Sequence, residues 1–226
     1  MSATGDIAGA LDRLALRRGR PVLVLVGGAA GMADAHLATL RAVLREAVLP
    51  LLHRLGAAVV DGGTDSGVMR VVGQVRRDDR AGFPLVGVAA EGTVKVPGAD
   101  APGPDAADLE PRHTHFVLVP GGQWGDESPW LADVADVVAD GAPSATLVVN
   151  GGKITFVDVG ASIARKRPVV VLAGTGRTAD AIARARTQPH DDPRAAALAS
   201  SPLTTIVAVD DVDGVRRALE AALRRA

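Results

Sequence analysis

The 226-residue sequence contains no cysteine, and this absence excludes three kinds of site. A disulfide scaffold, a zinc site built from thiolates and a cysteine nucleophile all require that residue. Acidic and basic residues nearly cancel, at 26 against 25, so charge gives no reason to expect a nucleic acid or an anionic membrane as a partner. No apolar run approaches the roughly 18 residues that a membrane-spanning helix needs.

The amino terminus lacks the pattern of a secretory signal. Residues 1–6 (MSATGD) show no charged region followed by an apolar core. We therefore expect a cytoplasmic protein.

Apolar runs alternate with helical patterns along the chain. Strands are expected at 21–26, 57–60, 83–89, 116–119, 145–149, 168–172 and 204–209. Helices are expected at 34–55 with a break at Pro50, 68–77, 130–140, 155–165, 178–186 and 212–223, the last one capped by Asp210 or Asp211. This alternation predicts a single α/β domain spanning 1–226, with a Rossmann-like, doubly wound and mostly parallel sheet of about seven strands.

Three segments fall outside that alternation. Residues 1–20 are expected to form an N-terminal arm with a short arginine-bearing helix or arm at 7–19. Residues 91–112 are rich in glycine, proline, aspartate and alanine and have no clear period, which predicts a flap. Residues 187–202 read as a polar connection.

Glycine turns follow four of the expected strands, at 27–31, 62–67, 151–152 and 174–176. A turn of this kind at the start of a helix forms an anion site, because the first helical N–H groups have no partner within the helix. The carboxyl ends of parallel strands lie at one edge of a sheet, where ligands bind. We therefore expect these turns to meet in one crevice and to hold phosphate groups.

Five blocks resemble, in order and spacing, the SLOG superfamily: GGTDSGVM, GVAAEGTV, HTHFVLV, NGGKITFVDV and VVVLAGTGRTADAI. They are most similar to its LSDAT group, which bacterial proteins share with the cytosolic N-terminal region of TRPM channels. The resemblance implies a module that senses a small nucleotide or an NAD-derived ligand such as ADP-ribose and has no chemistry of its own. No metal is implied, and a homo-oligomer is compatible with the sequence.

The resemblance and the glycine turns together imply one set of ligand-binding residues. They are Gly28, Gly62, Gly63, Thr64, Asp65, Gly67, Val68, Met69, His115, Asn150, Gly151, Gly152, Lys153, Thr155, Gly174, Thr175, Gly176 and Arg177. Thr175 replaces a serine that is usual in the family and keeps its hydroxyl. Arg177 is expected to face the anionic part of the ligand, with an ion pair to Asp180 as the alternative.

The chain resembles the LOG-type phosphoribohydrolases more distantly. In their register Ile154 stands for a glycine of the second turn and Asp158 for the catalytic glutamate. An enzyme that cleaves a nucleotide at its N-glycosidic bond, with Asp158 as the acid, is therefore a second hypothesis. An assembly module whose pocket is vestigial is a third.

Three further interpretations have less support. A dinucleotide fingerprint in the first glycine turn would use Asp61 as its ribose-binding acid, but Asp61 lies well beyond the roughly 20 residues expected. A metal site at His113 and His115 competes with a hydrogen-bonded histidine beside the ligand. Stacking of Trp124 or Trp130 on a base competes with simple packing.

Overall fold

The computed structural model describes residues 3–28, 34–188 and 192–224. Its centre is a seven-stranded sheet with the order β6-β3-β2-β1-β7-β8-β9, in which every neighbouring pair is parallel. The strands are β1 (Val22–Gly27), β2 (Ala58–Asp61), β3 (Leu85–Ala90), β6 (His115–Val119), β7 (Ser144–Val149), β8 (Val169–Ala173) and β9 (Thr204–Ala208). The predicted single, Rossmann-like α/β domain is confirmed.

The central strand β1 explains how the sheet is built. Val22 to Val26 are all buried, because helices cover both faces of the sheet. β1 pairs with β2 on one side and with β7 on the other, so the direction in which strands are added reverses at β1. In open α/β sheets such a reversal opens a crevice beyond the carboxyl ends of the strands.

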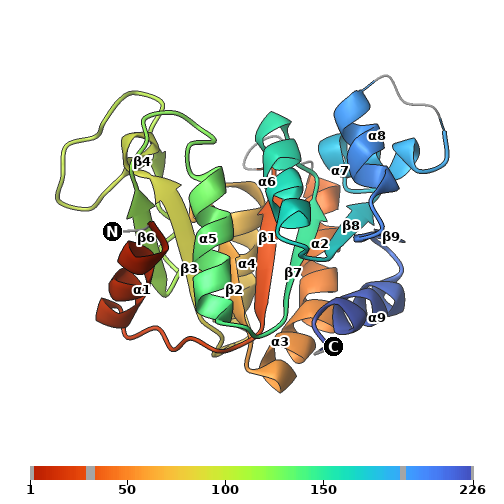
Figure 1. Ribbon diagram of the computed structural model, residues 1–226, viewed down its shortest axis with the longest axis horizontal. Coiled ribbons are helices and arrows are strands. Elements are labelled where there is room, and N and C mark those ends of the chain that lie inside the picture. The colour runs from red at the N-terminus through yellow and green to blue at the C-terminus, as the bar shows by residue number, and fades with distance from the viewer. Residues whose placement is uncertain (1–2, 29–33, 189–191, 225–226) are drawn as a thin grey trace.

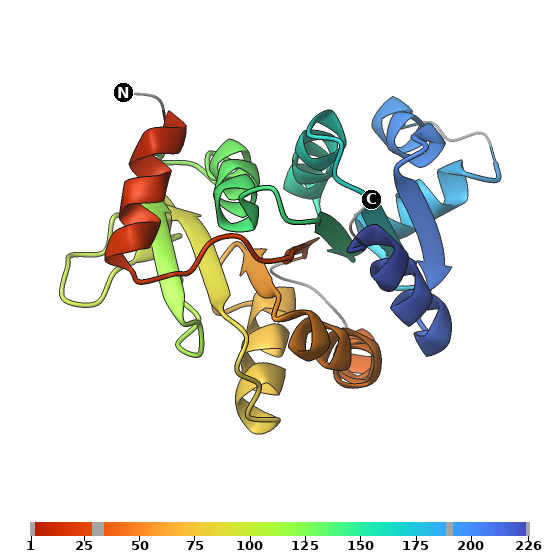
Figure 2. The same cartoon turned by 60° about the horizontal axis from the view of Figure 1, so that its bottom comes forward.

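The helices form one layer on each face of the sheet, as Figures 1 and 2 show from two directions. One face is covered by α1 (Ala3–Arg13), α5 (Ser128–Ala139), α6 (Lys153–Ala164), α7 (Arg177–Ala185) and α8 (Pro193–Ser200). The other is covered by α2 (Asp34–Val43), α3 (Leu49–Leu55), α4 (Gly67–Asp78) and α9 (Val212–Ala222). Each layer buries its own apolar cluster against the sheet.

The helix expected at 34–55 is divided close to Pro50, as predicted. α2 and α3 are joined by a π-helical turn at Leu44–Val48, and Pro50 lies in the first turn of α3. Proline has no N–H to donate to the preceding turn, which favours an altered hydrogen-bond pattern just before it. Leu44, Val48 and Leu52 still point into the core, so burial is continuous through the break.

The amino-terminal segment and the stretch 187–202 differ in part from expectation. Of the two alternatives expected near the amino terminus, the structure has the helix, α1, which begins earlier than expected and buries Ile7 and Leu11 in the core. The stretch 187–202, expected to be a polar connection, contains α8. Asp192 caps α8 by accepting the Arg194 N–H. Asp211 caps α9, as predicted, and accepts the Gly214 N–H at 2.8 Å.

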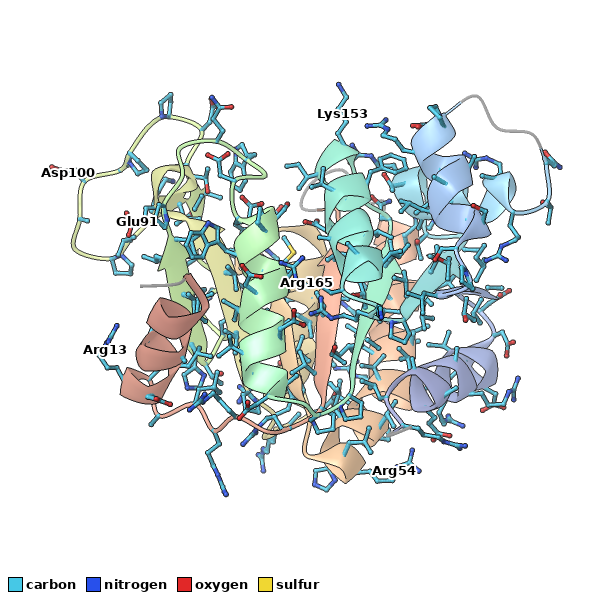
Figure 3. The ribbon with its side chains drawn as sticks, viewed as in Figure 1. Arg13, Arg54, Glu91, Asp100, Lys153 and Arg165 are labelled. Carbon is cyan, nitrogen blue, oxygen red and sulfur yellow. The ribbon has the colours of Figure 1, made fainter. Side chains whose placement is uncertain are left out.

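The segment 91–112 leaves the sheet and returns to it. It contains a 3-10 turn, η2 (Glu91–Thr93), and two short strands, β4 (Val94–Lys95) and β5 (Ala107–Asp108), that pair in parallel. The residues between these strands extend away from the sheet, as Asp100 does in Figure 3. Both ends of the segment are therefore anchored, and its behaviour as a flap stays a prediction.

Among the described residues, none of the helices combines the length and the apolar character needed to cross a bilayer. The expected cytoplasmic location stays a prediction.

Candidate functional site

A cavity of about 490 Å³ opens beyond the carboxyl ends of the central strands. Gly62 from the turn after β2, Gly152 from the turn after β7 and Arg177 from the turn after β8 all line it. Figure 3 shows Lys153 at this end of the molecule, at the start of α6, and Arg54 at the opposite end. The prediction that these three turns meet at one edge of the sheet is confirmed.

The turns after β7 and β8 are joined by Asn150 and Thr175, both buried. The Asn150 N–H donates to Thr175 Oγ1 at 2.8 Å, and Asn150 Nδ2 donates to the Thr175 carbonyl at 2.6 Å. Asn150 Oδ1 accepts the Gly151 N–H at 2.8 Å. The threonine hydroxyl therefore holds the neighbouring turn, a task that a serine hydroxyl would also perform.

The turn into α6 leaves no room for side chains. Gly151 has a φ of +105°, and a Cβ built on it would lie 2.8 Å from Thr155 Oγ1. That hydroxyl accepts the Gly152 N–H at 3.1 Å. The first N–H groups of α6, those of Lys153 and Ile154, have no acceptor within the helix, whereas the Thr155 N–H donates to the Gly152 carbonyl at 3.1 Å. These groups supply the positive end of the α6 dipole at the cavity.

The turn after β2 is equally tight. Gly63 has a φ of +67°, and a Cβ built on it would lie 2.8 Å from the Gly87 Cα. The Gly63 N–H donates to Asp61 Oδ1 at 2.8 Å. Thr64 lines the cavity, is only 3% exposed, and its Oγ1 has no hydrogen-bond partner within the described part of the chain. An unsatisfied buried hydroxyl at a cavity wall is a donor and acceptor available to a ligand.

Arg177 begins α7 in the left-handed region, with a φ of +49°. This conformation is unfavourable for a residue other than glycine and occurs where the surroundings enforce it. The guanidinium lies against the second turn, since a Cβ built on Gly152 would be 3.3 Å from Arg177 Nη2. Asp180 accepts the Gly174 N–H at 2.7 Å. Arg177 therefore faces the cavity, and the Asp180 carboxylate has a structural partner.

Two acidic residues, Glu127 and Asp158, also line the cavity. Burial, opposed by the nearby Ser128 hydroxyl and assisted by the charge of Glu127, raises the pKa of Asp158 to about 7. Asp158 and Ser128 do not reach hydrogen-bond geometry, and part of the Asp158 surface stays accessible from the cavity. Burial also raises the pKa of Glu127, whose Oε2 accepts the Gly125 N–H at 2.9 Å. The cavity therefore contains a carboxyl group that exchanges its proton near neutral pH.

The two tryptophans have different environments. Trp124 lines the cavity and is 44% exposed, whereas Trp130 is half-buried against the core. Asp126 fixes the loop that carries Trp124, because its Oδ2 accepts the N–H groups of Gly122 and Gln123 at 2.9 and 3.0 Å. Trp124 is thus the tryptophan with a face available to a planar ligand.

The residues expected from the sequence divide into two groups, apart from His115, which is described below. Those that line the cavity are Gly62, Thr64, Met69, Gly152, Lys153, Thr155, Arg177 and the alternative acid Asp158. Those that do not line it are Gly28, Gly63, Asp65, Gly67, Val68, Asn150, Gly151, Gly174, Thr175 and Gly176. Several of the second group shape the turns, and residues 29–31 of the first glycine turn lie outside the described residues.

The expectation for His115 is wrong. His115 begins β6, at the amino end of that strand, whereas the cavity lies beyond the carboxyl ends of the strands. The histidine beside the turn after β2 is His113, which precedes β6 and has a completely buried side chain. Among residues 3–28, 34–188 and 192–224, no group of three or more His, Asp and Glu side chains could hold a metal ion.

Asp61 and Glu110 surround His113. Its Nε2 lies 2.8 Å from Asp61 Oδ1, and its Nδ1 lies 2.9 Å from Glu110 Oε2. Burial lowers the pKa of His113, but the charges and hydrogen bonds of Asp61 and Glu110 outweigh it and raise the pKa to about 9. The Asp61 side chain is therefore buried within this cluster and does not line the cavity, which argues against a role as a ribose-binding acid, although its Oδ2 has no hydrogen-bond partner within the described part of the chain.

Other cavity residues were not among the ligand-binding residues expected from the sequence. They are Leu25, Val26, Gly27, Ser66, Ala89, Thr93, Ala107, Trp124, Glu127, Leu131 and Ile154. Leu25, Val26 and Ala89 lie toward the carboxyl ends of their strands. They could have been inferred from the rule that ligands of open α/β sheets bind beyond those ends. Thr93, Ala107 and Glu127 come from segments with no clear period, which leaves no sequence pattern for them, whereas Trp124 is a cavity residue for which stacking on a base was one of two interpretations.

Comparison with known proteins gives relatives among ion channels. The chain is 27% identical over 180 residues to transient receptor potential cation channel subfamily M member-like 2 of Nematostella vectensis. It is 27% identical over 185 residues to subfamily M member 2 of Mus musculus. The matches cover 63% and 66% of this chain but only 12% of either channel, so the similarity concerns a small part of those proteins.

Among solved structures, the molybdenum cofactor carrier protein MCP from Chlamydomonas reinhardtii has a similar fold. The TM-score is 0.59 at 18% identity, and the match covers 91% of this chain and 99% of that one. At this identity the likeness concerns the fold alone. The family model described as "SLOG in TRPM, prokaryote" matches residues 20–217, and the chain therefore belongs to this family.

Proposed function

We propose that the chain is a ligand-binding module for a nucleotide or an NAD-derived nucleotide such as ADP-ribose. The observation that carries the proposal is the meeting of three helix starts, those of α4, α6 and α7, at one cavity beside the Arg177 guanidinium. Helix N-termini and arginine both favour anionic oxygens, and arginine adds two parallel hydrogen bonds to a phosphate.

The distribution of charge supports one orientation of the ligand. Arg177, Lys153 and the start of α6 lie on the cationic side, which suits phosphates. Trp124 and Glu127 lie on other parts of the wall and suit a planar base and its N–H donors. The buried, unpartnered Thr64 hydroxyl adds a further polar contact.

A panel of AMP, ADP, ADP-ribose and NAD, measured by thermal shift and then by isothermal titration calorimetry, tests this proposal. A ligand at 100 times its Kd should stabilise the fold by about 2.7 kcal/mol. Arg177→Lys should weaken binding about tenfold, the equivalent of about 1.4 kcal/mol, and leave the Tm without ligand nearly unchanged. Arg184→Lys is the matched control, since Arg184 lies exposed on the same helix and does not line the cavity.

Equal binding by Arg177→Lys and the parent would remove the proposed phosphate site. Failure of the whole panel to bind, together with a stable oligomer, would favour an assembly module with a vestigial pocket.

One observation favours an enzyme as the second candidate. Asp158 lines the same cavity, and burial raises its pKa to about 7, so it could donate a proton near neutral pH. In N-glycosidic hydrolysis that proton would pass to the leaving base, while water would supply a hydroxyl to the ribose carbon and return a proton to the carboxyl group.

Chromatography of AMP, NAD and ADP-ribose incubated with the chain distinguishes the two candidates. Release of a free base that Asp158→Asn abolishes would support the enzyme. Intact nucleotides after long incubation, with binding demonstrated by calorimetry, would support the binding module.

A further inference from the structure

Backbone contacts tie the end of the 91–112 segment to the glycine turn after β2. The Glu110 N–H donates to the Gly63 carbonyl at 2.9 Å, and the Asp65 N–H donates to the Asp108 carbonyl at 2.8 Å. Thr64 also forms an antiparallel bridge with Leu109. The turn that lines the cavity therefore takes its position partly from this returning segment.

The buried cluster of Asp61, Glu110 and His113 lies beneath those contacts. All three side chains are inaccessible to solvent. Asp61 Oδ1 contacts both His113 Nε2 and the Gly63 N–H, each at 2.8 Å. His113 is therefore the side-chain link between the returning segment, through Glu110, and the glycine turn, through Asp61.

With both carboxylates ionised, the geometry requires a charged imidazole. An ionised carboxylate only accepts hydrogen bonds, and a neutral imidazole has a single N–H to donate. His113 has a carboxylate oxygen within 2.9 Å of each ring nitrogen, so only the imidazolium satisfies both contacts. A neutral His113 would turn one of them into a contact between two acceptors.

The charges around His113 balance only in this state. Asp61 and Glu110 are negative, His113 is positive, and Arg112 supplies the second positive charge by donating from Nη1 to Glu110 Oε1 at 2.7 Å. Asp65, before α4, and Asp78, at the end of α4, act on Arg112, and the uncharged Phe116 ring of β6 stacks 5.4 Å from the His113 ring. Loss of the His113 proton would leave a buried net negative charge, which is costly.

We propose that protonated His113 is a latch that holds the Gly62–Gly63 turn in its ligand-receiving position, and that loss of its proton loosens the turn and weakens binding at the cavity. His113 is thus a positioning residue that makes the site sensitive to pH. This inference rests on the proposed nucleotide-binding function and adds a mode of regulation to it.

Calorimetry with ADP-ribose on the full chain at pH 7.5 and 9.5 tests the latch. Asp158, with a pKa of about 7, is mostly ionised at pH 7.5, whereas the pKa of His113 is about 9, so the titration of His113 dominates this window. If only the protonated form binds, the Kd should rise about fourfold between the two pH values. His53→Gln should reproduce that rise, because His53 is exposed on α3 at the other end of the molecule.

Two cluster variants should remove the pH dependence for different reasons. His113→Gln has no titrating group, and it should bind weakly at both pH values because one carboxylate loses its donor. Glu110→Gln lets a neutral histidine donate to Asp61 and accept from the new amide, so its Kd should be the same at pH 7.5 and 9.5. A Kd that rises fourfold in either variant would overturn the proposal.

Hydrogen exchange without ligand gives an independent readout. After correction for intrinsic rates, protection of the Gly63, Asp65 and Glu110 amides should fall from pH 7.5 to 9.5, and NMR of the histidine rings should show His113 losing its proton over the same range. If His113 titrates while these protections stay constant, the latch is refuted. If no nucleotide binds at either pH but protection falls as expected, the proposed function fails and the latch stands as a structural device.

Discussion

Replacing Gly73 by alanine should destabilise this fold, although the same change stabilises most helix interiors. Gly73 lies within α4, where alanine is favoured over glycine by about 1 kcal/mol. A Cβ at this position would overlap the Glu110 carboxylate. That carboxylate is completely buried and held by His113 and Arg112, so it has no alternative place with equal partners.

The magnitude follows from these two opposing effects. Breaking a buried ion pair costs about 3–5 kcal/mol, and the helix propensity returns about 1 kcal/mol. We therefore expect Gly73→Ala to lower the free energy of unfolding by about 2–4 kcal/mol, a large share of the 5–15 kcal/mol typical of a domain. Urea denaturation followed by circular dichroism measures this loss as a lower midpoint at unchanged slope.

Gly160→Ala is the matched control. Gly160 lies within α6, and a Cβ there would meet nothing within 4 Å, so the substitution should stabilise the fold by about 1 kcal/mol. If both substitutions stabilise the protein equally, Glu110 is not held where we describe it, and the account of the buried cluster is wrong.

Three other predictions concern His113 and two residues of the cavity, Asp158 and Arg177. The unfolding free energy should fall by up to about 1.4 kcal/mol per pH unit between pH 7.5 and 9, because the folded state keeps a proton on His113, with a pKa of about 9, that the unfolded chain releases near 6.5. Urea titrations should show this slope in the parent and its absence in His113→Gln. Asp158→Asn should be more stable than the parent at pH 8 and equally stable below about pH 4, since the raised pKa of Asp158 makes its ionisation unfavourable to folding; equal stability at both pH values would argue against a desolvated carboxyl. Arg177→Lys should bind nucleotide more weakly in isothermal titration calorimetry while its Tm without ligand stays nearly unchanged. Arg184→Lys, the matched control, should change neither quantity.

The sheet could be predicted because its strands are unusually easy to recognise. Runs such as 22–26 and 169–172 are continuously apolar, as strands buried on both faces require, and a glycine turn follows each of them. Because the carboxyl ends of parallel strands lie at one edge of a sheet, the meeting of the glycine turns at that edge could also be predicted. The helix α8 was missed because its flanks are polar, although Asp192 and Pro193 form a recognisable start signal.

The site could be predicted only as far as backbone turns determine it. His113 and His115 are two residues apart, and a strand running through both would point them to the same side. The strand begins at His115, so His113 is free to turn inward toward Asp61 and Glu110. Contacts of this kind join residues far apart in the chain and leave no periodic signal in the sequence.

A crystal structure of the chain with ADP-ribose tests the central claim most directly. We expect the pyrophosphate oxygens to lie within hydrogen-bond distance of the Arg177 guanidinium and the first N–H groups of α6, with the Gly62–Gly63 turn alongside. A pyrophosphate bound elsewhere, or a cavity left empty while the ligand occupies another surface, would contradict the account.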